Sequence, residues 1–261
     1  MRVSLPGCSH PDNSFRIPVR LLLTVICLLS VFSAHAEVIK SIDIATPEWT
    51  EITNADGTGL YFELLHLVYD PFGIKINFII VPWMRAVSYV DSRQCDALPG
   101  SYNTVDAFFP FYPIDTEHAA VVFKKETVKE WNGQKSMNNR SVAWVRGYNY
   151  HKYLDTRVRR VEVNQSDQGW KMLLSDRVDF LMNSEQAINK YIEHNKLNRD
   201  DYEIETILIK DLYLRFAKTE KSKRLIKIYD QRMAELIYSG EIRSLFKKWN
   251  FRYPRFDDIG K

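Results

Sequence analysis

Residues 158–194 read VRRVEVNQSDQGWKMLLSDRVDFLMNSEQAINKYIEH, and this stretch decides the fold class. Its β-branched runs, Val158 to Val163 and Val178 to Met182, are typical of strands. Asp167 to Ser175 and Glu185 to His194 instead carry apolar residues at helical spacing. Short strands that alternate with helices of this length predict α/β architecture, with helices that flank a mixed sheet.

The same alternation continues on both sides of this stretch. The other predicted strands are Val38 to Ala45, Ile74 to Val81, one beginning at Cys95 to Leu98, Ser141 to Val145, Tyr202 to Lys210 and Leu212 to Lys218. The other predicted helices are Gly59 to Tyr69, Trp83 to Asp91, Tyr148 to Asp155, Glu220 to Tyr238 and Glu241 to Trp249. Two such series without a Pro/Gly-rich linker predict two lobes joined by short strands that act as hinges.

The composition is that of an ordinary globular protein. The chain has 261 residues, of which 45% are apolar, with 36 Lys and Arg against 33 Asp and Glu. These values exclude disordered, collagen-like and disulfide-stapled classes. The length suits one large domain or two smaller ones.

The first 36 residues have the three parts of a secretory signal peptide. Arg16 to Arg20 form a positive segment, Leu21 to Phe32 an apolar run, and Ala34 to Ala36 a small-x-small cleavage site. A retained membrane anchor is the alternative, but the apolar run is shorter than the roughly 20 residues that a spanning helix needs. The sequence therefore predicts cleavage after Ala36 and a periplasmic location.

Cleavage would change the charge and the cysteine content. It would remove three arginines and one aspartate, which leaves 33 basic and 32 acidic residues and a net charge of +1 in place of +3. Cys8 and Cys27 would also be lost, so Cys95 would remain alone without an intramolecular disulfide. No Lys/Arg cluster in the sequence indicates a nucleic-acid partner.

The common catalytic motifs are missing from the sequence. It contains no Gly-x-Ser-x-Gly, no phosphate-binding Gly-x-x-x-x-Gly-Lys, no His-Glu-x-x-His and no Gly-x-Gly-x-x-Gly. Cys95 lies in an apolar segment and is interpreted as a small buried residue instead of a nucleophile. The sequence thus predicts a protein that is not an enzyme, without catalytic residues, cofactor or metal.

Several motifs occur in an order that resembles one known family. They are Asp43-Ile-Ala-Thr-Pro-Glu-Trp49, Gly59-Leu-Tyr-Phe-Glu63, Val81-Pro-Trp-Met-Arg-Ala86, Cys95-Asp-Ala-Leu98, Phe109-Pro-Phe-Tyr-Pro113, Ser141 to Gly147, Leu173 to Phe180 and Tyr238 to Trp249. Together they are similar to the bacterial extracellular solute-binding proteins of family 3, the type II periplasmic binding proteins of ABC transporters. The likeness spans roughly Val38 to Asn250.

The resemblance implies the type II two-lobe fold, with a hinge between the lobes. The first lobe would comprise residues 37–124 and 213–261, and the second residues 125–212. A solute would bind in the cleft between them, with Trp49 and Trp83 as stacking walls. The implied binding residues are Glu48, Trp49, Trp83, Arg85, Gly100, Ser101, Asn103, Arg146, Tyr148, Asn149, Asn183 and Ser184.

Two departures from the family pattern bear on the ligand. The amino-acid binders of the family hold the α-carboxylate with an arginine after the polar loop, but this chain has no arginine between Arg93 and Arg140. They hold the α-ammonium with an aspartate at a position where this chain has Asn183. The resemblance therefore implies an amino-acid-like polar solute other than a standard α-amino acid.

Three functions remain open at this point. The first is a monomeric periplasmic binding protein that delivers its solute to an ABC permease. The second is a sensor or orphan receptor with the same fold that signals to a membrane kinase. The third and most remote is an enzyme on this fold, which would need a catalytic dyad in the cleft.

Overall fold

The computed structural model describes Met1 and residues 38–256. Apart from Met1, the predicted signal peptide with Cys8 and Cys27 lies outside the described residues. None of the described helices is long and apolar enough to cross a membrane.

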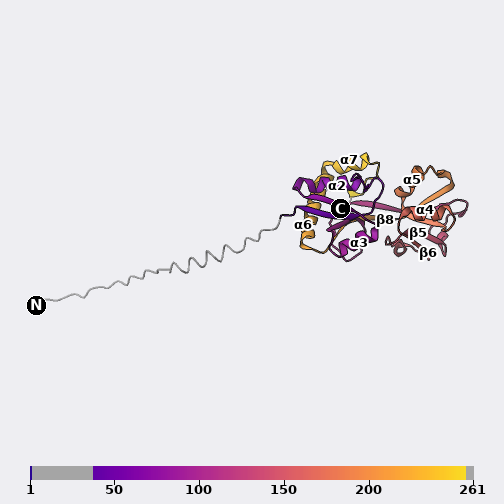
Figure 1. Cartoon of the computed structure of the whole chain (residues 1–261), viewed down its shortest axis with the longest axis horizontal. Coiled ribbons are helices and arrows are strands. Elements are labelled where there is room, and N and C mark those ends of the chain that lie inside the picture. Colours follow the sequence, from indigo (N-terminus) through magenta and orange to yellow (C-terminus); the bar gives the residue numbers. More distant parts are fainter. Residues whose placement is uncertain (2–37, 257–261) are drawn as a thin grey trace. The chain divides into compact units, whose positions relative to one another are not determined.

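One eight-stranded sheet runs through the molecule (Figure 1). Its strands follow the order β2-β1-β3-β8-β4-β7-β5-β6. They are β1 (Ser41–Thr46), β2 (Lys75–Ile80), β3 (Ala97–Ser101), β4 (Asp115–Lys124), β5 (Ser141–Val145), β6 (Arg159–Val163), β7 (Phe180–Ser184) and β8 (Tyr202–Phe216). Pairing within β2-β1-β3 and within β7-β5-β6 is parallel, whereas β4 and β8 pair antiparallel with their neighbours.

Helices pack on both parts of this mixed sheet. The α-helices of the described residues are α2 (Leu60–Tyr69), α3 (Trp83–Asp91), α4 (Ser166–Leu174), α5 (Glu185–His194), α6 (Glu220–Ser239) and α7 (Glu241–Lys248). The same part of the chain forms the short 3-10 helices η1 (Asp70–Phe72), η2 (Lys135–Met137), η3 (Tyr150–Tyr153) and η4 (Arg199–Asp201). We call the part built on β1–β3 with α2, α3, α6 and α7 the first lobe, and the part built on β5–β7 with α4 and α5 the second lobe.

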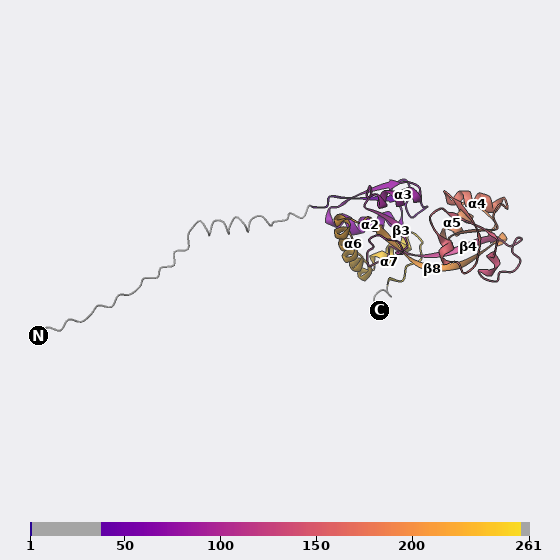
Figure 2. The ribbon, with the colours of Figure 1, turned by 90° about the horizontal axis from the view of Figure 1, so that it is seen from below.

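Two adjacent strands carry the chain between the lobes. Strand β4 pairs with β8 from Asp115 opposite Leu212 to Lys124 opposite Tyr202, with a register shift between Ala119 and Ala120. The last residues of β8 pair with β3 of the first lobe. Figure 2 shows β4 and β8 side by side where the chain passes from one lobe to the other. The fold thus provides a two-stranded connection, the kind of element that serves as a hinge.

The first lobe owes its core to amphipathic helices. Helix α6 buries Leu225, Tyr229, Met233 and Leu236, which are spaced three or four residues apart and so share one face. This face packs in a single cluster with buried residues of α2, α7 and β1. The spacing of apolar residues in the sequence therefore sets both the helix and its buried face.

The second lobe buries both faces of β5 and of the second half of β4. In β4, Val121 and Phe123 belong to one core cluster while Ala120 and Val122 belong to another on the opposite face. All five residues of β5 are buried, with Trp144 on the first of these faces. This two-sided burial explains why these two segments are mainly apolar and do not alternate with polar residues.

The structure confirms most predicted elements and corrects three. The predicted helix Tyr148 to Asp155 is wrong, because only the 3-10 helix η3 forms; Asn149 before it is left-handed, with φ of 57°, and Leu154 after it is extended. The two strands predicted on either side of Asp211 are one strand, β8. Strand β4 was not predicted, because its first half, Asp115 to His118, is polar and shows no alternation of apolar and polar residues.

Candidate functional site

Three aromatic rings from distant parts of the chain meet between the lobes. Trp49 follows β1, Trp83 begins α3, and Tyr148 follows β5 of the second lobe. The indole rings of Trp49 and Trp83 have centroids 6.0 Å apart, and the Tyr148 ring stands perpendicular to Trp83 at 5.8 Å. Trp49 Nε1 donates a hydrogen bond of 3.1 Å to the Tyr148 hydroxyl. We call these three residues the aromatic contact.

Two glycines allow the rings to approach the backbone. A Cβ at Gly100 would lie 2.9 Å from Cη2 of Trp49, and a Cβ at Gly147 would lie 3.0 Å from the Trp83 ring and 2.3 Å from Sδ of Met84. Both glycines have positive φ, 81° and 88°, which disfavours any L side chain there. Close packing and backbone conformation therefore both require glycine at these positions.

Local structure fixes the two tryptophans. Pro82, with φ of −55° and ψ of 148°, turns the chain from β2 into α3 and leaves Trp83 as the first helical residue, 9% exposed. The backbone N–H of Trp49 donates to Thr53 Oγ1 at 3.1 Å, and the same hydroxyl donates to the Pro47 carbonyl at 2.7 Å. Contacts within the first lobe therefore position both tryptophans independently of Tyr148.

Two carboxylates on β4 lie next to the aromatic contact. The Glu117 carboxylate accepts hydrogen bonds from the hydroxyls of Tyr102 and Tyr150, the latter at 2.7 Å. Removal from water raises the pKa of Glu117, partly offset by these two hydrogen bonds. Asp115 accepts a hydrogen bond of 3.0 Å from Tyr61, and burial raises the pKa of Asp115 to about 7. The connecting strand thus carries two carboxylates in an environment that disfavours their charge.

A second contact between the lobes is made of charged and polar groups. Lys190 on α5 forms an ion pair with Glu51 of the first lobe, and Gln186 donates a hydrogen bond of 3.2 Å to the backbone carbonyl of Asn250. Arg252 lies 3.6 Å from the Glu185 carboxylate. His118 contacts Arg252 through Nδ1 at 2.7 Å. We use the name charged contact for the set Lys190, Glu51, Gln186, Asn250, Arg252, Glu185 and His118.

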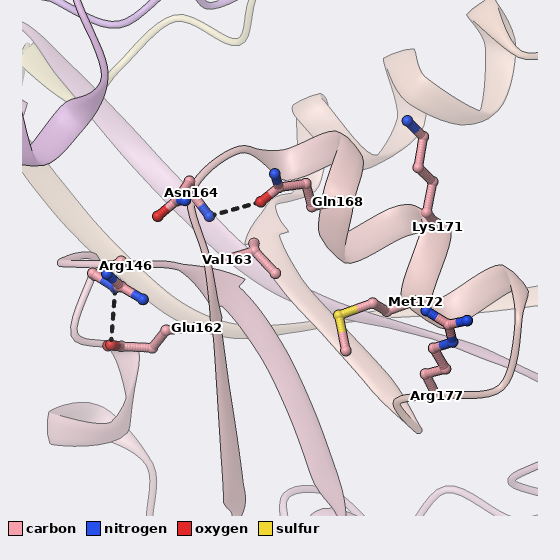
Figure 3. Close-up of a pocket in the computed structure, with 8 residues that line it drawn as sticks. All are labelled: Arg146, Glu162, Val163, Asn164, Gln168, Lys171, Met172 and Arg177. Atoms are coloured by element: carbon pink, nitrogen blue, oxygen red, sulfur yellow. Dashed lines mark hydrogen bonds and ion pairs between the residues drawn. The ribbon is translucent and has the colours of Figure 1, made fainter.

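The second lobe also carries an open groove of about 350 Å³ (Figure 3). Arg146 forms an ion pair of 3.8 Å with Glu162 at one side, and the backbone N–H of Asn164 donates to Gln168 Oε1 at 3.0 Å. Lys171 and Arg177 add positive charge to the groove. Arg146 therefore lines this groove, with its guanidinium next to a carboxylate.

Four predicted site residues have defined positions near the aromatic contact or at the end of β7. Ser101 is buried beside Tyr102, and its hydroxyl donates to the Tyr102 carbonyl at 3.2 Å. Asn149 donates to the Gly147 carbonyl at 2.8 Å. Asn183 donates to Ser166 Oγ at 2.9 Å, and Ser184 caps α5 by accepting from the Ala187 N–H. These hydrogen bonds are internal and support the local backbone.

The other predicted residues divide into two sets. The structure brings Trp49, Trp83, Gly100 and Tyr148 together in one packed contact. It leaves Glu48, Arg85, Asn103 and Arg146 exposed. A role of any of these residues in binding stays a prediction.

Sequence reasoning did not find the residues around Glu117. Tyr102, Glu117 and Tyr150 are separated by 15 and 33 residues, and none forms part of a spaced motif. The antiparallel pairing of β4 with β8 and the course of η3 bring them together. Within the part of the chain that the structure describes, no group of three His, Cys, Asp or Glu side chains is arranged to hold a metal ion.

Known proteins match this chain in structure but not in sequence. No family model and no curated protein sequence matches it. A mutant of ArgBP from T. maritima superposes with a TM-score of 0.68 at 14% identity and covers 80% of this chain and 95% of its own. A substrate-binding protein of an ABC uptake transporter from Streptococcus pneumoniae, with bound histidine, gives 0.67 at 18% identity over 84% and 94%.

A ligand-binding core outside these transport proteins matches equally well. The GluR0 core from Nostoc punctiforme, in complex with L-glutamate, gives a TM-score of 0.67 at 15% identity and covers 80% of this chain and 98% of its own. The likeness extends over nearly the whole of each known structure, both lobes included. The chain therefore has the two-lobe α/β fold of the type II periplasmic binding proteins that was predicted from its motifs.

Proposed function

We propose that this chain is a non-catalytic binding protein that holds a small polar solute between its two lobes. The observation that carries the proposal is the aromatic contact, in which Trp49 and Trp83 of one lobe face Tyr148 of the other. Aromatic faces with a few polar groups are typical walls of solute sites, because they bury much of a small ligand's surface.

The two-stranded connection provides the movement that such a site needs. In this structure the three rings touch, so a solute enters only when the lobes separate about β4 and β8. Closure then exchanges ring-to-ring contacts for contacts between rings and solute. Trp83 packs with Ala86 and Val90 of its own helix in a cluster that also includes Val145 and Val163 of the second lobe, so opening would separate these two groups of residues.

The transport role is the remaining part of the proposal. A periplasmic protein with residues 1–36 removed would deliver the solute to an ABC permease. Similar solved structures support this role, because they are substrate-binding proteins of ABC transporters. The predicted division into residues 37–124 with 213–261 and residues 125–212 is kept as the proposed pair of lobes. The ligand is proposed to be amino-acid-like but other than a standard α-amino acid, since no arginine lies between Arg93 and Arg140.

Solute binding is tested by thermal unfolding in the presence of a panel of amino acids, amines, small peptides and organic acids. A bound solute raises Tm by mass action, because it binds only the folded state. Trp49→Ala should abolish the shift, because it removes one wall of the site. Trp131→Phe is the matched control, since Trp131 stacks on Phe123 within the second lobe. A panel without any shift, or a shift that Trp49→Ala leaves unchanged, would contradict the proposal.

A further inference from the structure

Glu117 has an unusual set of partners for a carboxylate at the centre of the molecule. It lies on β4, and it accepts hydrogen bonds from Tyr102 of the first lobe and Tyr150 of the second. Within the described part of the chain, no lysine, arginine or histidine lies within ion-pair distance of it. Its negative charge is therefore held by two neutral hydroxyls, one from each lobe, and a carboxylate removed from water binds a cation strongly.

The cation opposite Glu117 in the sheet lies on aromatic rings instead. Lys210 is directly opposite Glu117 in the pairing of β4 with β8. Its ammonium nitrogen lies 5.5 Å from the ring centroid of Tyr102 and 4.9 Å from that of Tyr153, and these two rings are perpendicular at 5.4 Å. The aromatic surface beside Glu117 thus already holds one ammonium group by cation–π interaction.

This group of residues is continuous with the aromatic contact. The Tyr150 ring, whose hydroxyl binds Glu117, lies 5.7 Å from the Tyr148 ring and perpendicular to it. Tyr148 in turn contacts Trp83 and Trp49. A solute inserted between the indoles and Tyr148 therefore has the Glu117 carboxylate close to it through Tyr150, whereas Asp115, the other carboxylate on β4, is bound by Tyr61 of the first lobe.

We propose that Glu117 recognises an organic ammonium group of the solute, which the aromatic rings around it enclose. This inference rests on the proposed function, since it names the class of ligand for the same site. The tethered ammonium of Lys210 lies on the ring of Tyr102, whose hydroxyl binds Glu117, so it competes with the solute's ammonium for this aromatic surface. An α-carboxylate on the solute is not required, because the end of β3 and the loop after it offer the hydroxyl of Ser101 and the amide of Asn103 but no cation.

The charge requirement is tested by calorimetric titration with three small probes of similar size. They are n-butylammonium, choline and butyrate, which present a primary ammonium, a quaternary ammonium and a carboxylate. At least one of the two cations should bind and butyrate should not. Binding of butyrate with neither cation would overturn the inference while leaving the proposed function intact. If the Tm panel described above also shows no solute of any class, the proposed function itself fails.

Two substitutions with opposite expected effects locate the charge. Glu117→Gln keeps the shape: its amide oxygen accepts from one tyrosine hydroxyl and its amide nitrogen donates to the oxygen of the other. The fold should therefore persist while affinity for the cation falls about tenfold or more. Lys210→Met removes the competing ammonium and should strengthen binding of the same probe. Equal affinity in the Glu117→Gln and native proteins would overturn the inference, as would weaker binding in Lys210→Met.

Discussion

The aromatic contact and the charged contact both join the two lobes, but they do so by different physics. In the aromatic contact, large rings pack at 5.8–6.0 Å and two glycines with positive φ are needed to admit them. In the charged contact, Lys190, Gln186 and Arg252 join their partners with side chains that remain partly solvated. Close packing is sensitive to shape, whereas solvated ion pairs are sensitive to salt.

This difference indicates that the aromatic contact fixes the relative position of the two lobes, whereas the charged contact tolerates changes in that position. Rings that pack against backbone at a glycine tolerate little change, so the aromatic contact has few alternative arrangements. Long charged side chains keep contact over a range of separations and contribute little stability each. We therefore expect substitutions in the aromatic contact to have large effects and those in the charged contact to have small, salt-dependent ones.

The largest effect is expected from Trp83→Ala. It removes a nearly buried ring and should lower the free energy of unfolding by about 3–5 kcal/mol, measured by urea denaturation. Tyr238→Ala is the control, because this aromatic residue is 95% exposed and its loss should change stability by less than about 0.5 kcal/mol. A loss for Trp83→Ala as small as that of the control would show that the aromatic contact is not closely packed.

An intermediate effect is expected from Gly147→Ala. Gly133→Ala is its matched control, because Gly133 also has positive φ, 63°, but nothing lies within 4 Å of its built Cβ. Both substitutions introduce the same backbone strain, and the clash of the new Cβ with Met84 Sδ and the Trp83 ring should make Gly147→Ala less stable than the control by about a further 1–3 kcal/mol. Equal Tm values for the two variants would mean that neither side chain packs closely on Gly147.

The smallest effect is expected from Glu51→Gln in the charged contact. Loss of the ion pair with Lys190 should lower stability by about 1 kcal/mol or less, because the Glu51 side chain is 45% exposed and the Lys190 ammonium keeps its contact with the Phe251 ring. The difference from the native protein should shrink in 1 M NaCl, where charges are screened within about 3 Å. Urea denaturation at low and high salt measures it, and a loss that persists in full at high salt would show a role beyond electrostatics.

The family resemblance implied that Trp49, Trp83 and Tyr148 line one cleft, and the structure brings their rings together. Their role in binding stays a prediction. The residues around Glu117 were not predicted. The polar first half of β4 has no strand pattern in the sequence. Only the pairing of β4 with β8 shows that Lys210 lies opposite Glu117.

By itself, the sequence determined the alternation of strands and helices, the buried faces of α6 and the order of motifs that implies a two-lobe fold. Periodicity and turn residues are local properties, so they can be read along the chain. The tertiary structure alone decided that β8 is one strand and that Tyr102 and Tyr150 meet at Glu117. Such contacts depend on register and lobe closure, which bring together residues that have no fixed spacing in the sequence.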